Sequence, residues 1–215
     1  ISSLKNVNWS KVDLLYLSLP NGEAQKITKK LFKYEHLKFI DLSADFRIEN
    51  IKEYKKWYSI NHSAKNLVKK SIYSIPEFTK NKIRNHRIIA NPGCYPTSVQ
   101  LALVPLMLKS LIETNNIIID SKSGYSGAGK NYKFKFTHKN IDSSIFAYGI
   151  EKHRHMSELD QQFKKIIKSK LEYTFNPHLL PTFRGILSSI YLVKKINVTI
   201  FGIYNALKKF YSKNE

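Results

Sequence analysis

Three short apolar runs in the first ninety residues are separated by helix-like segments, and this alternation limits the possible folds more than any other feature. Residues 12–19, 37–42 and 87–90 are expected to be strands. An amphipathic helix that ends near Lys33 joins the first two, and a short helix is expected at about 50–58. Strands joined through helices run parallel in one sheet. The pattern therefore predicts an α/β protein that begins with a doubly wound parallel sheet, with its chemistry at the carboxyl ends of the strands.

The second half of the chain orders its elements differently. Its apolar patterns indicate three helices, each with one apolar face, and three strands. We expect helices at 94–109, from about 156 and after the cap residue 199, and strands at 117–120, 173–180 and 187–195. Residues 131–147 are polar and are expected to be irregular. Because helices and strands do not alternate regularly here, this half is predicted to be an α+β domain.

The composition describes a globular protein, since 42% of the 215 residues are hydrophobic and 13% are aromatic. The chain carries 36 lysines and arginines against 16 acidic residues, a formal charge of +20. The lysines are scattered as pairs without interleaved aromatic residues, so we expect solvated lysines and no nucleic-acid partner. No apolar run is long enough to cross a bilayer, so no membrane partner is expected. The single cysteine rules out an intrachain disulfide and fits a reducing compartment, the cytoplasm.

That cysteine, Cys94, stands where a predicted strand passes through an Asn-Pro-Gly turn into a predicted helix. The free N–H groups and the dipole of a helix N-terminus stabilise a thiolate, which is the form that acts as a nucleophile. A cysteine can also be a small hydrophobic residue packed in a core. The segment by itself does not favour the nucleophile over the packed residue.

A glycine-rich run, SGYSGAGK, occupies residues 123–130 after a predicted strand. Such a backbone can approach a ligand closely, and its N–H groups can surround a phosphate or an amide. Its spacing matches neither the dinucleotide fingerprint nor a P-loop. We interpret it as a ligand-binding loop, with an ordinary flexible loop as the alternative.

Two further segments carry charged or imidazole side chains. His155 and Glu158 are three residues apart and would share one helix face, which suits a general acid/base oriented by a carboxylate. The spacing does not match a zinc motif, and a polar helix start is the alternative. Arg184 lies in a turn between two strands, where a guanidinium can bind an oxyanion, but the segment alone favours an ordinary surface arginine. Asp45 and Arg47 follow a strand and suggest a local ion pair.

Taken together, five segments resemble the N-acetyl-γ-glutamyl-phosphate reductases, relatives of aspartate-semialdehyde dehydrogenase. They appear in that family's order and at roughly its spacing. The matching segments are residues 42–47 (LSADFR), 91–97 (NPGCYPT), 123–130 (SGYSGAGK), the group His153, Arg154, His155 and Glu158, and residues 177–179 (PHL) with Pro181 and residues 184–187 (RGIL).

The resemblance implies NADPH-dependent reduction of N-acetyl-γ-glutamyl phosphate to N-acetylglutamate semialdehyde and phosphate, in arginine biosynthesis. It implies that Cys94 attacks the acyl carbon to form a thioester and that His155 moves the protons. The shared helix face makes Glu158 the candidate that orients His155. The candidate substrate-binding residues are Asn91, Arg154 and Arg184, and the candidate cofactor contacts for NADP(H) are Ser123, Gly124, Ser126, Gly127, Ala128 and Gly129.

The resemblance also divides the chain into the remainder of a Rossmann-type dinucleotide-binding domain, residues 1–95, and a catalytic and dimerisation domain, residues 96–215. It implies a homo-oligomer. The family's glycine-rich dinucleotide fingerprint and its C-terminal strands and helix are not found in this sequence. We therefore expect the middle of a longer enzyme, or the product of an eroded gene, that binds NADP(H) poorly by itself. A lysine-pathway acyl-phosphate reductase and a truncated, non-catalytic interaction subunit are the alternatives.

Overall fold

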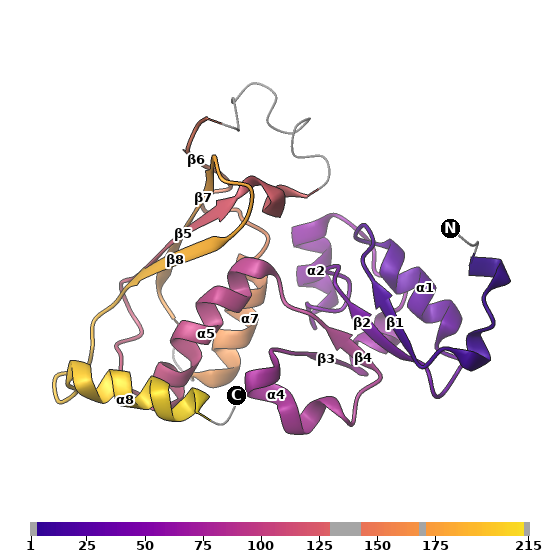
Figure 1. Ribbon diagram of the computed structural model, residues 1–215, viewed down its shortest axis with the longest axis horizontal. Coiled ribbons are helices and arrows are strands. Elements are labelled where there is room, and N and C mark those ends of the chain that lie inside the picture. Colours follow the sequence, from indigo (N-terminus) through magenta and orange to yellow (C-terminus); the bar gives the residue numbers. More distant parts are fainter. Residues whose placement is uncertain (1–3, 130–142, 168–170, 213–215) are drawn as a thin grey trace. The chain divides into compact units, whose positions relative to one another are not determined.

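The computed structural model describes residues 4–129, 143–167 and 171–212. The chain divides into two compact units, Ile1–Gly93 and Cys94–Glu215. The elements of both are labelled in Figure 1. Lys130 and most of the segment that was expected to be irregular lie outside the described residues. The predicted α/β class, a parallel sheet followed by a mixed part, is confirmed.

The first unit is built on a four-stranded sheet in the order β1-β2-β4-β3, in which every neighbouring pair is parallel. Two short 3₁₀ turns, η1 (Leu4–Asn6) and η2 (Trp9–Lys11), precede the first strand. The strands are β1 (Leu14–Leu17), β2 (Lys38–Asp41), β3 (Ser71–Tyr73) and β4 (Ile88–Ala90), and the helices are α1 (Glu23–Leu31), α2 (Ile51–Tyr58), α3 (Lys65–Val68) and α4 (Pro76–Ile83).

The three strands predicted in this unit lie inside the predicted runs, whereas β3, α3 and α4 were not predicted. Strand β3 has only three residues, all of them half-buried, so it shows no alternation that a sequence pattern could reveal. It forms because β4 offers it a parallel partner, with Tyr73 paired to Ala90.

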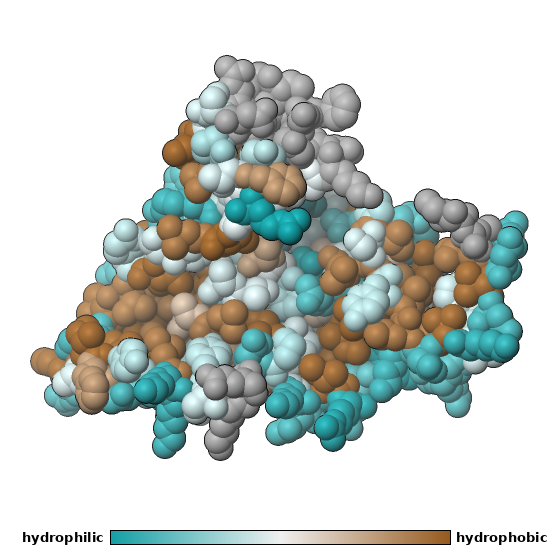
Figure 2. Space-filling model, viewed as in Figure 1, coloured by the Kyte–Doolittle hydropathy of each residue, from teal (hydrophilic) through white to brown (hydrophobic). Residues whose placement is uncertain are grey.

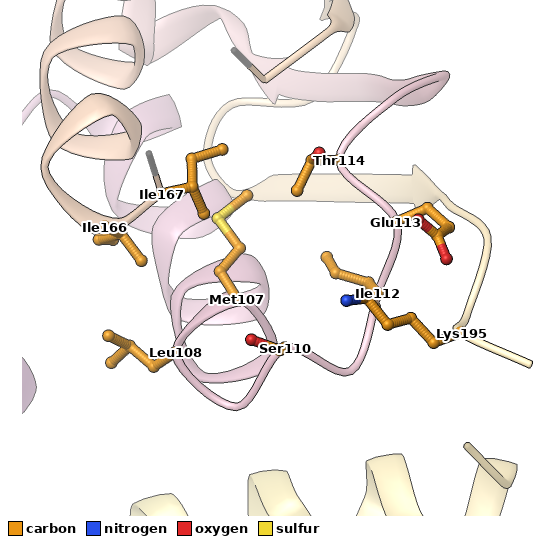
Figure 3. A pocket seen from close by; sticks show the side chains of 9 residues that line it. All are labelled: Met107, Leu108, Ser110, Ile112, Glu113, Thr114, Ile166, Ile167 and Lys195. Atoms are coloured by element: carbon orange, nitrogen blue, oxygen red, sulfur yellow. The ribbon is translucent and has the colours of Figure 1, made fainter. Parts of the chain in front are cut away.

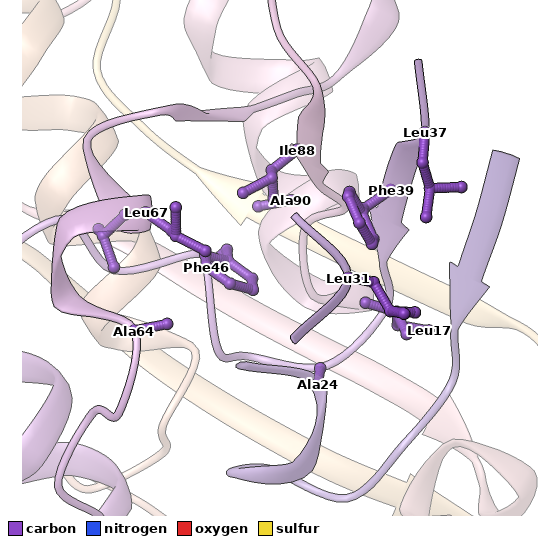
Figure 4. Close-up of a cluster of buried hydrophobic side chains, with 11 residues drawn as sticks. Leu17, Ala24, Leu31, Leu37, Phe39, Phe46, Ala64, Leu67, Ile88 and Ala90 are labelled. Atoms are coloured by element: carbon purple, nitrogen blue, oxygen red, sulfur yellow. The ribbon is translucent and has the colours of Figure 1, made fainter. Parts of the chain in front are cut away.

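The core of the first unit lies where α1 and the loops after β2 pack against the sheet (Figure 4). Phe39 and Ile88, from neighbouring strands, have no exposed surface. The other buried members of the cluster are Leu17, Ala24, Leu31, Leu37, Phe46, Ala64, Leu67, Val68 and Ala90. Burying each large apolar side chain contributes about 1.5–3 kcal/mol, so this cluster accounts for much of the unit's stability.

Asp45, in the loop after β2, is a buried carboxylate that joins three elements. Its Oδ1 accepts hydrogen bonds from the Gly22 N–H (2.7 Å) and the Tyr54 hydroxyl (2.6 Å), and its Oδ2 accepts one from the Gln25 N–H (3.0 Å). It thereby satisfies N–H groups at the start of α1 that have no partner within the helix. The sequence suggested a local ion pair with Arg47, but the carboxylate acts over a longer range as the cap of α1.

Replacing Asp45 with alanine would leave these three buried donors without their acceptor. Because each unsatisfied donor costs about 1–3 kcal/mol, we expect Asp45→Ala to lower the free energy of unfolding by about 3 kcal/mol or more. Urea denaturation followed by circular dichroism measures this. Asp13→Asn, which alters an exposed residue of the same unit, is the control and should change stability by less than about 0.5 kcal/mol. Equal stabilities for the two variants would contradict the capping role.

The second unit contains a mixed sheet in the order β6-β7-β5-β8. Its strands are β5 (Ile117–Gly124), β6 (Phe146–Ala147), β7 (Tyr173–Leu180) and β8 (Ile186–Tyr191). Its helices are α5 (Cys94–Leu108), α7 (Met156–Ile166) and α8 (Ile200–Tyr211), with a 3₁₀ turn, η3 (Tyr125–Ala128), after β5. The central pair β5 and β7 is parallel, and β8 and β6 flank it in antiparallel orientation.

One face of this sheet is covered and the other is open. On β5, Ile117, Ile119, Ser121 and Ser123 are buried, while the residues between them are partly or fully exposed. Helix α5 packs on the buried side, where Ser188 of β8 joins the hydroxyls of Ser98 (2.8 Å) and Ser121 (2.7 Å).

Strand β5 extends four residues beyond its predicted end, because residues 121–124 pair with β7 and residues 121–123 also pair with β8. Strand β8 ends at Tyr191, four residues before its predicted end.

Exposed apolar side chains gather over β8 and α8 (Figure 2). They include Leu187, Tyr191, Val193, Ile196, Ile200, Phe201 and Tyr204. Helix α8 has no buried residue, although the Tyr211 hydroxyl donates to the Leu101 carbonyl of α5. Among the described helices, none combines the length and the apolar character that a membrane crossing requires.

Candidate active site

Cys94 is the first residue of α5, and it is exposed. The interpretation of this cysteine as a buried packing residue is therefore wrong. A side chain at the first position of a fifteen-residue helix lies beside N–H groups that lack intrahelical acceptors. Those groups and the helix dipole favour an anion, so the position suits a thiolate.

The turn that leads to Cys94 is held by hydrogen bonds to backbone carbonyl groups within the first unit. The Asn91 N–H donates to the Asp41 carbonyl (2.8 Å), and Nε of Arg47 donates to the Asn91 carbonyl (2.7 Å). Nη2 of Arg47 also donates to the Leu42 carbonyl (2.8 Å). A guanidinium that is only 8% exposed thus joins the ends of β2 and β4. This fixes the backbone of Asn91, while its side-chain amide donates to the Pro92 carbonyl (3.1 Å).

The start of α7 carries the second group of candidate residues. His155 is the N-cap, and its Nε2 lies 3.9 Å from Oε1 of Glu158, which is fully buried. This separation is too long for a direct hydrogen bond, and the two side chains form an ion pair when His155 is protonated. The Ser157 hydroxyl donates to the carbonyl of Arg154 (2.6 Å), and the Arg154 side chain is exposed.

Tyr95, the residue after Cys94, brings α5 and the histidines together. Its ring centroid lies 5.5 Å from that of His153 and 6.0 Å from that of His155, both in edge-to-face geometry. The two histidine rings are 4.9 Å apart. The fold therefore places the predicted proton-transfer residue beside the first turn of the helix that Cys94 begins.

His153 has a different character from an ordinary surface histidine. Burial, with a smaller contribution from the positive charge of Arg154, lowers the pKa of His153 to about 4. Its Nδ1 accepts a hydrogen bond from the backbone N–H of His155 (3.3 Å). Near neutral pH, His153 is therefore uncharged and supports the backbone of its neighbour.

The glycine-rich run and the Arg184 turn form one structure. The N–H groups of Gly124, Tyr125 and Ser126 donate to the carbonyls of Gly185, Thr182 and Phe183 at 2.9–3.0 Å. Two of the predicted ligand-binding segments are thus brought together at the ends of β5 and β7 and the start of β8. These three N–H groups are already hydrogen-bonded within the protein. They therefore do not bind a ligand in the way that the sequence led us to expect.

Gly124 is required by this close approach. A Cβ atom at this position would lie 2.7 Å from the Arg184 nitrogen and 2.8 Å from the carbonyl carbon and oxygen of Phe183. These are backbone atoms, which cannot rotate away as the end of a side chain could. Gly127 is different, since its Cβ would meet only the Ser123 side chain, at 3.4 Å or more.

The contrast between the two glycines gives a test. We expect Gly124→Ala to lower the free energy of unfolding by about 1–3 kcal/mol, because the Arg184 turn must move away from β5. Gly127→Ala, in the same run, should change it by less than about 0.5 kcal/mol. Thermal unfolding compares them. If Gly124→Ala were as stable as Gly127→Ala, the turn would not be held as described.

Several residues of this region were assigned no role from the sequence. Tyr95 and Tyr148 are hydrogen-bonded to each other through their hydroxyls (3.2 Å), and burial raises the pKa of both. A third group, Asp120 with Lys122 and His178, lies on the open face of the sheet, where Nδ1 of His178 is 3.1 Å from the Asp120 carboxylate. Only strand pairing brings these residues together.

A hollow of about 430 Å³ lies near the far end of α5 (Figure 3). Its wall is mixed: Met107, Ile112, Ile166 and Ile167 are apolar, and Glu113 and Lys195 are charged. It contains none of the predicted site residues.

Two models of known protein families match the two parts of the chain. Residues 94–215 match the semialdehyde dehydrogenase dimerisation domain, and residues 1–86 match the semialdehyde dehydrogenase NAD-binding domain. The chain belongs to the semialdehyde dehydrogenase family.

Its curated relatives confirm the resemblance to the N-acetyl-γ-glutamyl-phosphate reductases. The chain is 42% identical over 99% of its length to the probable chloroplastic N-acetyl-γ-glutamyl-phosphate reductase of Arabidopsis thaliana, covering 53% of that protein. It is 44% identical over 95% of its length to the N-acetyl-γ-glutamyl-phosphate reductase of Clostridium botulinum, covering 59% of it. The chain thus spans between half and two thirds of the length of these relatives.

Solved structures show the same fold. Aspartate semialdehyde dehydrogenase II of Vibrio cholerae, complexed with ASA, superimposes with a TM-score of 0.65 at 16% identity, covering 97% of this chain and 63% of that one. The aspartate semialdehyde dehydrogenase of Francisella tularensis gives 0.60 at 13% identity, covering 94% and 64%.

Proposed function

We propose that this chain carries the acyl-transfer site of an N-acetyl-γ-glutamyl-phosphate reductase of arginine biosynthesis. The observation that supports this best is an exposed cysteine at a helix N-terminus beside the α7 start that carries His155. In the proposed reaction the Cys94 thiolate attacks the acyl carbon. The carbon–oxygen bond to phosphate breaks, phosphate leaves with the bonding electron pair, and a thioester remains on Cys94.

The later steps divide between the chain and a cofactor. Reduction of the thioester requires a hydride, which NADPH supplies when it is bound. In our proposal His155 protonates the resulting oxygen and takes the proton back when the carbon–sulfur bond breaks, so that the aldehyde leaves and the thiolate is regenerated. Glu158 stabilises the charged form of His155, and the exposed Arg154 and Arg184 bind the anionic groups of the substrate. Asn91 borders the cysteine turn as a further substrate contact.

The first unit matches the model of an NAD-binding domain. We propose NADP(H) as its cofactor. The described residues of the first unit fit the pyrophosphate of this cofactor poorly, because the Asp45 carboxylate already occupies the N-terminus of α1. We therefore expect NADP(H) to bind weakly to these residues. Ser123, Gly124, Ser126, Gly127, Ala128 and Gly129 remain the proposed contacts of its reactive end. The reducing conditions that a free cysteine needs agree with a cytoplasmic location.

The acyl-transfer step can be tested without the cofactor. Incubation with N-acetyl-γ-glutamyl phosphate should release phosphate once per chain and leave an acyl group on Cys94, detectable by intact-protein mass spectrometry. Cys94→Ser should abolish both, and His155→Gln should slow the burst by about 10²-fold or more. Phosphate release by Cys94→Ser at the normal rate would reject the covalent route. A faster reaction with the longer acyl phosphate of the lysine pathway, or no reaction with either, would support the corresponding alternative.

We further propose that the open face of the second sheet is where two copies of the chain associate. The family model of this unit is a dimerisation domain. Ile118 (45% exposed), Leu187 (63%) and Tyr191 (60%) lie around the charged group of Asp120 and Lys122 on this face. In a two-fold contact a surface meets its own copy, so a patch that carries both an acid and a base can pair with itself.

Two tyrosines of similar exposure test this surface. Tyr191→Asp should shift the chain from dimer to monomer in light scattering coupled to size-exclusion chromatography, because it places an unpaired charge in the contact. Tyr16→Asp, on β1 and 62% exposed, should leave the oligomeric state unchanged. The surface would be excluded if Tyr191→Asp dimerised as strongly as Tyr16→Asp.

A further inference from the structure

Tyr95 occupies the position between the proposed nucleophile and the proposed proton carrier. It is 1% exposed and directly follows Cys94 in the first turn of α5. Its ring meets His153, His155 and Phe175 edge-on, at centroid distances of 5.5, 6.0 and 5.4 Å. A single rigid ring therefore touches both histidines and is joined through one peptide bond to the cysteine.

The Tyr95 hydroxyl fixes this ring from two sides. It donates to the carbonyl of His178 on β7 (3.2 Å) and accepts a hydrogen bond from the Tyr148 hydroxyl (3.2 Å). Tyr148 lies just before the histidine segment, and its own ring is 5.4 Å from that of His153. The Tyr148 N–H donates to the Pro177 carbonyl of β7 (3.1 Å). Helix α5, strand β7 and the segment before α7 are thus linked through one phenol.

Glu158 does not hold the Nε2 edge of the His155 ring by a direct hydrogen bond, since Nε2 lies 3.9 Å from Oε1 of Glu158. A thiolate–imidazole pair depends on a separation that holds to within a fraction of an ångström. The edge-on contact with Tyr95 provides a restraint of this kind, because aromatic pairs have preferred distances and angles.

We infer that Tyr95 is a positioning residue, which sets where the His155 ring stands relative to the Cys94 sulfur. This inference rests on the proposed function, because it concerns the same thiol–imidazole pair. It adds a residue that neither transfers a proton nor forms a bond to substrate. Its ring restrains His155 directly, and its hydroxyl keeps the ring in place.

The test follows the reactivity of the only cysteine in the chain. The rate of Cys94 alkylation by iodoacetamide is measured from about pH 5 to about pH 10, which reports the apparent pKa of the thiol. Tyr95→Leu removes the ring, and Tyr95→Phe removes only the hydroxyl. Tyr173→Phe is the matched control, since it removes a hydroxyl bonded to Asp160 (2.7 Å) in the same unit.

We expect Tyr95→Leu to move the midpoint of alkylation upward by about one pH unit, because a less well placed imidazolium stabilises the thiolate less. Tyr95→Phe should move it in the same direction by less, and Tyr173→Phe should not move it. A residue that only supported the fold would lower the unfolding temperature and leave this midpoint unchanged. Circular dichroism establishes which variants are folded, and Tyr95→Phe carries the test if Tyr95→Leu is not.

His155→Gln separates this inference from the function on which it rests. If His155→Gln raises the midpoint and the folded Tyr95 variants do not, the role of Tyr95 is rejected while the thiol–imidazole pair stands. If His155→Gln has no effect, both are rejected. If the variants at both positions raise the midpoint of alkylation, the variant that combines them should show little more than the larger single effect. The reason is that Tyr95 and His155 act on one interaction.

Discussion

A buried tyrosine ring joins the elements on which the candidate site depends. Tyr95 is on α5, the histidines lie at the start of α7, and Phe175 is on β7, and their rings meet edge-on. These ring contacts join the first turn of α5 to the start of α7, in addition to the direct packing of the two helices. This packing brings together the segments that carry the exposed thiol of Cys94 and the imidazole of His155.

In the first unit, charged side chains and not aromatic rings hold the loops at the carboxyl edge of the sheet in place. Parallel strands end at one edge of a sheet, so several loops with unsatisfied backbone groups meet there. Asp45 supplies acceptors to the start of α1, and Arg47 supplies donors to the carbonyls after β2 and β4. The LSADFR segment is thus the structural element that organises this edge. The same arrangement leaves the N-terminus of α1 occupied by a carboxylate.

The two faces of the sheet in the second unit differ in their side chains. The face under α5 carries buried apolar residues and a chain of serine hydroxyls, whereas the open face carries Ile118, Asp120 and Lys122. Leu187 and Tyr191 of β8, which pair with Lys122 and Ile118, add exposed apolar surface to this face. The dimerisation domain of the family agrees with the proposed self-association of this face, because a sheet face that carries exposed apolar residues is stabilised when a second copy covers it.

The sequence by itself determined the fold class, the strands β1, β2 and β4, and the position of Cys94 at a helix start, because all of these follow from local periodicity and turn chemistry. It also determined the family, since the motifs are contiguous runs of residues. Strand β3, the extension of β5 to Gly124 and the cap formed by Asp45 were decided only by tertiary structure. So were the contact between the glycine-rich run and the Arg184 turn, and the position of Tyr95 among the histidines. In each of these cases the partner is distant along the chain, so no local pattern records the interaction, and only the packed structure satisfies it.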